Sequence, residues 1–251
     1  MQTLPIYILI FLYGLLIGSF VNVVIYRVPE KLNIVTTRSH CMSCDYQLKW
    51  YDLIPLFNYL ALRGKCRNCK AKISVQYPII EVLNGGLYVL VFAKWGLSVE
   101  SLLYCLLFSA LIAISVIDFR TYEIPLGING FILLLGVLQV VFHLSMWKDY
   151  LIGFLAVSLP LYLIYQVTKG RGIGGGDVKL MAVCGLLIGW QNIILAFFLG
   201  CIIGSVIHVV RMRVSGAEHV LAMGPYLSVG VMIAALWGQD MIAWYLGYLG
   251  L

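Results

Sequence analysis

Two aspartates lie where an apolar stretch of the chain meets a polar one. Asp118 ends the apolar run 111–117, and Asp177 follows Gly174–Gly176 and opens the next apolar stretch. Ionisable side chains at such positions are costly and point to a functional site by default. If the two carboxyl groups meet, they share one proton and titrate as a coupled pair. The ionised member then activates water while the protonated member polarises a carbonyl, which is peptide hydrolysis without a metal.

In a second interpretation, these two acids have no catalytic role. Asp118 lies two residues before Arg120, and Asp177 lies two residues before Lys179. Both carboxylates could therefore simply reach the membrane interface and stay solvated there. Spacing alone does not decide between the two interpretations.

Four cysteines form the next candidate site. Cys41-x-x-Cys44 and Cys66-x-x-Cys69 are separated by 21 residues, which is close to the spacing of a four-cysteine zinc ribbon. A polar segment of this size lacks a sizeable apolar core, so a bound metal would help it fold. We expect structural Zn²⁺ here, with His40 as an alternative ligand and thiol redox chemistry as an alternative role.

The composition requires these sites to be carried by membrane helices. Hydrophobic residues make up 62% of the 251 residues and charged residues 11%, and the mean hydropathy is +0.96. Too little polar surface remains for a water-soluble globule. Nine of the 17 basic residues fall in 27–77, so the net charge of +6 reflects one hydrophilic insert. We predict no nucleic-acid partner.

Apolar stretches predict an all-α polytopic protein with about eight transmembrane helices. The stretch 178–210 is ambiguous, because Leu180–Val210 as one helix would be about 46 Å long and overshoot a bilayer core of about 30 Å. A turn at Gly189–Asn192 divides it into two spans. The expected spans are 4–26, 78–93, 100–117, 125–145, 150–168, the two legs of 178–210, and 221–246.

The distribution of basic residues gives the orientation. Eight spans with the N-terminus outside place 15 of the 17 basic residues on the inner side. The expected parts are then a first transmembrane helix at 1–26, a small cytoplasmic zinc-ribbon-like insert at 27–77 and a helical catalytic domain at 78–251. Asp118 and Asp177 both fall at the cytoplasmic ends of their helices.

Five blocks of the chain, in order, resemble the type IV prepilin peptidases, which are intramembrane aspartyl proteases with a G-x-G-D motif. One departure is that Met42 follows the first cysteine, where the family commonly has proline. The matching blocks are Gly18–Pro29, Gln76–Glu81, Asp118–Pro125, Gly174–Leu180 and Met223–Leu227.

The resemblance implies a function and a location. Asp118 and Asp177 would be the catalytic pair, removing the basic leader peptide from prepilin or pseudopilin precursors at the cytoplasmic face of the bacterial cytoplasmic membrane. Many members also N-methylate the new N-terminus with S-adenosylmethionine, and Glu81 and the insert are candidates for that activity. Membrane lipid is the other expected partner.

Two functions of other classes remain as alternatives. An ion-coupled transporter would use the same two aspartates as a proton relay, but it would place them near the bilayer midplane and show inverted repeats. A membrane thiol oxidoreductase would need its cysteine pairs on the oxidising side of the membrane.

Overall fold

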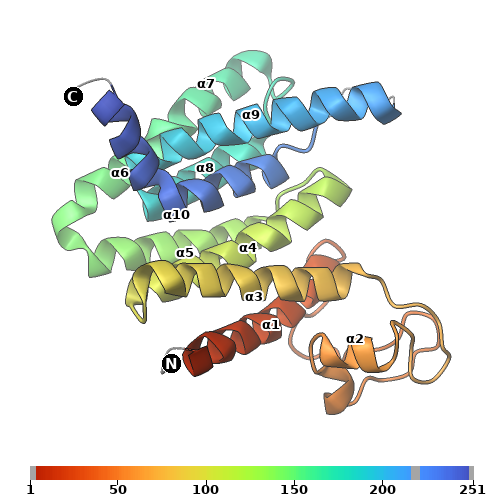
Figure 1. Cartoon of the computed structure of the whole chain (residues 1–251). Coiled ribbons are helices and arrows are strands. Elements are labelled where there is room, and N and C mark those ends of the chain that lie inside the picture. The colour runs from red at the N-terminus through yellow and green to blue at the C-terminus, as the bar shows by residue number, and fades with distance from the viewer. Residues whose placement is uncertain (1–3, 216–220, 249–251) are drawn as a thin grey trace. The chain divides into compact units, whose positions relative to one another are not determined.

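The computed structural model describes residues 4–215 and 221–248, whose regular secondary structure consists of helices without any β-strand (Figure 1). The expected parts 1–26 and 78–251 therefore include positions, 1–3, 216–220 and 249–251, that lie outside the described residues. The helices are α1 (Leu4–Arg27), η1 (Trp50–Leu53), α2 (Phe57–Ala61), α3 (Gln76–Trp95), α4 (Val99–Thr121), α5 (Leu126–Phe142), η2 (Leu144–Met146), α6 (Trp147–Ala156), α7 (Ser158–Thr168), α8 (Gly175–Ile188), α9 (Trp190–Ser215) and α10 (Gly224–Tyr248).

The all-α, multi-pass architecture is confirmed. Within the described residues, six helical stretches are long and apolar enough to cross a membrane, counting η2, α6 and α7 as one. Helix α5 has 17 residues and α8 has 14, so α8 is about 21 Å long and shorter than a bilayer core. The expected number of eight spans therefore stays a prediction.

Two helix breaks have local causes. Gly189 has φ +82° between α8 and α9, a conformation that glycine adopts without strain. The predicted break is therefore found at Gly189, but Trp190–Asn192, which were expected in the turn, already belong to α9. The single span expected at 150–168 is divided at Val157 between α6 and α7. Pro160, which lies just beyond this break, has no N–H to donate to the Ala156 carbonyl.

The chain forms two compact units, residues 1–113 and 114–251, with the boundary inside α4. In the first unit, α1 and α3 cross closely because glycines remove the side chains between them. A Cβ on Gly14 would lie 2.7 Å from the Cα of Gly85, and a Cβ on Gly18 would lie 2.8 Å from the Cα of Glu81. Small residues at such spacing allow membrane helices to approach.

In the second unit, α8 is the central helix. Its residues from Val178 to Ile188 are buried, apart from Lys179. Helices α5, α6, α7, α9 and α10 all contact it. Gly153 of α6 and Gly185 of α8 touch through their backbones, so neither position has room for a side chain. The packing of α8 fixes the direction of its first turn, which carries Asp177.

Candidate active site

Asp118 lies in the last turn of α4 and is almost completely buried, with 5% of its surface exposed. Its Oδ2 accepts a hydrogen bond of 2.9 Å from the backbone N–H of Gly224, the first residue of α10. The first N–H groups of a helix have no partner within the helix and carry partial positive charge. The start of α10 therefore both orients this carboxyl group and stabilises negative charge on it.

Asp177 is the third residue of α8 and is half-buried. The preceding backbone leaves little room, because a Cβ on Gly174 would lie 2.9 Å from the Asp177 Oδ2. The Asp177 carboxyl group also forms a hydrogen bond with the Gly174 backbone. Both aspartates of the candidate pair thus lie at the N-terminus of a helix, α10 for Asp118 and α8 for Asp177.

One cavity of about 290 Å³ in the second unit brings the two aspartates together. Their carboxyl groups are close enough for the charge of Asp118 to act on Asp177. A space of this size admits an extended stretch of peptide and a water molecule. Its lining residues are Asp118, Tyr122, Glu123, Ile124, Leu126, Gly174, Gly175, Gly176, Asp177 and Lys179.

The glycine run and the Ile-Pro turn meet directly beside this cavity. A Cβ on Gly176 would lie 3.0 Å from the Cβ of Ile124, so α8 starts in tight contact with the Ile124-Pro125 turn, and a larger residue at 176 would have to displace Ile124. Pro125 then caps α5 with an extended backbone. The Ile-Pro motif after Asp118 and the glycine run before Asp177 therefore pack against each other.

The hydrogen bond from Gly224 to Asp118 is a contact of the candidate site that sequence reasoning missed. Met223–Leu227 was matched as a block, but no role was assigned to it. The available signal was Gly224-Pro225 at the start of an apolar helix, since proline favours the first helical turn and glycine permits a close approach. A backbone N–H donor is not marked by any particular residue type, so the sequence gives no other sign of this contact.

The four cysteines of the insert converge in the first unit. The Sγ atoms of Cys41, Cys44, Cys66 and Cys69 all lie within 4.8 Å of one another. Four thiolates around one point at these separations fit the tetrahedral site of a structural metal. His40 is exposed, and its ring nitrogen lies 3.4 Å from the Arg38 carbonyl. It is not part of the cluster.

Each cysteine pair lies in a turn with the same hydrogen bonds. In the first turn, the Cys41 N–H donates to the Tyr46 carbonyl and the Asp45 N–H donates to the Cys41 carbonyl. In the second turn, Cys66, Ala71 and Lys70 form the same two bonds. The residue after each pair has positive φ, +53° at Asp45 and +61° at Lys70. The two turns are a structural repeat with an offset of 25 residues.

Backbone donors tune two of the four thiols, Cys66 and Cys44, toward the form that binds metal. At Cys69 a hydrogen bond with the Ala71 backbone acts in the same direction, but the neighbouring thiols and burial outweigh it and raise the pKa to about 11. A hydrogen bond from the Cys69 backbone is the largest influence on Cys66 and lowers its pKa to about 7. A hydrogen bond from the Tyr46 backbone lowers the pKa of Cys44 in the same way. Since thiolates are the ligand form, the site suits a metal better than a set of neutral thiols.

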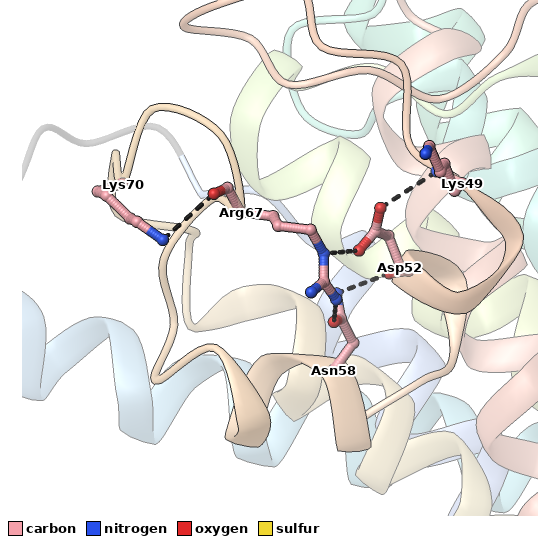
Figure 2. Close-up of polar contacts among 5 residues, drawn as sticks. All are labelled: Lys49, Asp52, Asn58, Arg67 and Lys70. Carbon is pink, nitrogen blue, oxygen red and sulfur yellow. Dashed lines mark hydrogen bonds and ion pairs between the residues drawn. The ribbon is translucent and has the colours of Figure 1, made fainter.

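A polar cluster lies beside the second cysteine turn (Figure 2). The Arg67 Nε lies 2.7 Å from the Asp52 Oδ1, and Asp52 also accepts a bond from the Lys49 N–H. Asn58 bridges the pair, because its amide donates to the Asp52 carbonyl and accepts from the Arg67 guanidinium. This cluster joins η1 and α2 to the second cysteine turn.

Glu81 lies in the first unit and is buried, with 6% of its surface exposed. Its Oε2 accepts a hydrogen bond of 2.8 Å from the Leu56 N–H, and the Ser19 side chain is its second partner. Glu81 thus joins α3, α1 and the insert. These contacts suit a structural role as well as the expected role in methyl transfer.

Comparison with known proteins decides the family. The model of the type IV leader peptidase family matches residues 105–209, and that of the bacterial peptidase A24 N-terminal domain matches residues 12–95. A prepilin leader peptidase/N-methyltransferase from Pseudomonas putida is 33% identical over 268 residues, covering 94% of this chain and 92% of that protein. The chain belongs to the type IV leader peptidase family.

Other relatives agree with this membership. Proteins named prepilin leader peptidase/N-methyltransferase from Stutzerimonas stutzeri and Bacillus subtilis are 34% and 32% identical to this family member. The matches cover 92% and 97% of the lengths of these two proteins. The prediction of an enzyme is therefore confirmed, and nothing in these matches supports the transporter alternative. No solved structure matches the chain.

Proposed function

We propose that this enzyme removes the leader peptide from prepilin-like precursors by aspartyl hydrolysis at Asp118 and Asp177. The observation that carries the proposal is the single cavity lined by both carboxyl groups. The names of the relatives supply the substrate class, precursors of type IV pilin and related proteins. The glycine-rich wall of the cavity gives a peptide backbone room to approach both acids.

The hydrogen bond from Gly224 supports a division of roles. A backbone group bonds to each carboxyl group, Gly224 to Asp118 and Gly174 to Asp177, and we assign Asp118, whose donor is the α10 N–H at 2.9 Å, as the general base and Asp177 as the general acid. Asp118 takes a proton from water, the oxygen attacks the scissile carbonyl, and the Asp177 proton goes to the carbonyl oxygen. When the tetrahedral intermediate collapses, Asp118 gives its proton to the leaving amine and the hydroxyl proton returns to Asp177.

The deciding experiment uses purified enzyme and a tagged prepilin precursor. Asp118→Asn and Asp177→Asn should each lower the cleavage rate by more than about 100-fold while thermal unfolding stays unchanged. Asp149→Asn is the matched control, because Asp149 lies in the first turn of α6 and outside the cavity. The wild-type rate should fall at both low and high pH, since one shared proton is needed. Normal cleavage by either Asn variant at Asp118 or Asp177 rejects the assignment.

The cysteine cluster is proposed as a structural zinc site. Cys41, Cys44, Cys66 and Cys69 would hold one Zn²⁺, whose role is to fix the two turns and not to take part in hydrolysis. The cytoplasm keeps such thiols reduced, which favours metal over a disulfide.

A second activity is proposed for the first unit. The names of the relatives include N-methyltransferase, so we extend N-methylation of the mature pilin, with S-adenosylmethionine as donor, to this chain. Glu81 is the proposed residue, because it is a buried carboxylate beside the insert. A buried carboxylate could bind the cationic methyl donor or the amine of the substrate.

The proposed location is the bacterial cytoplasmic membrane, with the N-terminus outside and the cavity and insert at the cytoplasmic face. The excess of basic residues in 27–77 supports this orientation. A membrane-impermeant thiol reagent tests it: the insert cysteines should react in inverted vesicles and stay protected in intact cells.

A further inference from the structure

The insert carries an apolar surface that its fold does not cover. Five large side chains between residues 50 and 60 are exposed, and they come from η1, α2 and the turn between these helices. The exposed fractions are 78% for Trp50, 45% for Leu53, 43% for Ile54, 60% for Phe57 and 62% for Leu60. We call Trp50–Leu60 the apolar segment. In water such a cluster promotes aggregation, so a contiguous patch of this kind marks a contact surface.

A hydrogen bond fixes the depth of this segment relative to the membrane helices of the same unit. The Leu56 N–H donates to Glu81, which lies five residues after the start of α3 at Gln76, about 8 Å along the helix. The second partner of Glu81 is Ser19, which lies eight residues before the end of α1 at Arg27, about 12 Å along that helix.

The apolar segment therefore reaches beside the two helices and not only beyond their ends. In Figure 1, α2 lies next to the end of α1 from which the insert emerges. Both helices are long and apolar enough to cross a membrane, and the polar headgroup region is about 5–8 Å thick on each side of the hydrocarbon core. A loop held 8–12 Å along such spans lies at the boundary between headgroups and acyl chains.

The charges beside the segment suit the same environment. Lys49 precedes it and Arg63 follows it, and both side chains are exposed. The acid within the segment, Asp52, is buried and paired with Arg67, so it does not oppose an anionic surface. A tryptophan at the interface, aliphatic side chains below it and flanking cations are typical of interfacial membrane segments.

We propose that Trp50–Leu60 is an interfacial membrane anchor, with its apolar side chains in the leaflet and Lys49 and Arg63 among anionic headgroups. The anchor holds the cysteine insert against the bilayer beside α1 and α3. This role is independent of the proposed peptidase chemistry, because it concerns the first unit alone.

The test measures the surroundings of Trp50 in the full-length protein. The protein is placed in nanodiscs containing anionic lipid, with either ordinary or brominated acyl chains, and the fluorescence of Trp50 is taken as the difference between wild type and Trp50→Phe. We expect brominated lipid to quench this difference signal and aqueous acrylamide to leave it largely unchanged. Shallow bromine positions should quench more strongly than deep ones.

A matched control places the probe elsewhere in the insert. Val35 is 90% exposed and lies outside the apolar segment, so Val35→Trp in the Trp50→Phe background should be quenched by acrylamide and not by brominated lipid. The same result for Trp50 itself would overturn the proposal, because the segment would then face water. Protection of Trp50 from both quenchers would also overturn it, since a protein partner would then cover the segment.

Discussion

The backbone N–H of Gly224 lies 2.9 Å from the Oδ2 of Asp118, joining residues that are 106 positions apart in the sequence. This bond places the start of α10 against the end of α4. It gives a buried carboxylate a backbone donor and leaves no space between the two residues. The candidate active site thus depends on a backbone group as much as on its two acids.

Gly224→Ala should impair cleavage more than stability. A Cβ at this position would lie 2.7 Å from the Asp118 Oδ2, so the carboxyl group must move and lose its donor. A hydrogen bond to a charged group is worth about 1.5–3 kcal/mol, which corresponds to a rate loss of about 10- to 100-fold.

The control for this variant is Gly247→Ala in the same helix, where a Cβ meets nothing within 4 Å. Initial rates on a prepilin precursor, measured alongside thermal unfolding, separate the two effects. Equal loss of activity in both variants would show that alanine in α10, and not displacement of Asp118, is responsible.

Cys66→Ser should remove the metal from the insert. Three thiolates and a hydroxyl hold zinc poorly, so we expect the content to fall from about one zinc per chain to near zero. Elemental analysis of the purified protein measures this directly. Cys201→Ser is the control, because Cys201 lies in α9 and outside the cluster, and it should keep the full content. A wild-type protein without bound zinc would refute the site.

Asp52→Asn should loosen the insert without touching a ligand. The Asp52 side chain is buried, whereas that of Arg67 is 44% exposed, so we expect a loss of about 1–2 kcal/mol in the stability of the insert. Faster zinc loss to a chelator and faster proteolysis between residues 30 and 75 report this. Asp45→Asn is a close control, because Asp45 is exposed and asparagine tolerates its positive φ. Equal zinc loss from both variants would show that the ion pair has no structural role.

Glu81→Gln separates chemistry from structure at one buried position. Glutamine keeps an oxygen acceptor for the Leu56 N–H but loses the charge, so folding should be preserved. If Glu81 acts in methyl transfer, the amount of methylated mature pilin, which is 14 Da heavier than the unmethylated product, should fall by about 10-fold or more, while the rate of cleavage stays unchanged. Parallel loss of methylation and cleavage would indicate that Glu81 is needed for the fold instead.

Much of the fold follows from simple physical patterns in the sequence. Uncharged stretches predicted the helices, because a bilayer leaves few other solutions for the backbone. Gly189 was identifiable as a helix break because 31 uncharged residues exceed one span. The cysteine cluster was predictable from spacing, since two residues between thiols fit one turn.

Other features could not be read from the sequence. The first leg of 178–210 was expected to be a membrane span, but α8 has only 14 residues, and burial by protein and burial by lipid select the same apolar residues. The division between α6 and α7 at Val157 lies within an apolar run with no charge to mark it. The contacts from Gly224 to Asp118 and from Leu56 to Glu81 use backbone donors, which every residue except proline possesses.

The repeated turns at Cys41–Tyr46 and Cys66–Ala71 have a consequence for assembly. Each turn supplies half of a tetrahedron, and two sulfur atoms alone hold an ion only weakly. Both turns must therefore bind the ion at the same time, so each molecule should hold either one fully coordinated ion or none. A cobalt titration would then show a single spectral species growing in proportion to added ion, with no intermediate in which one arm is loaded first.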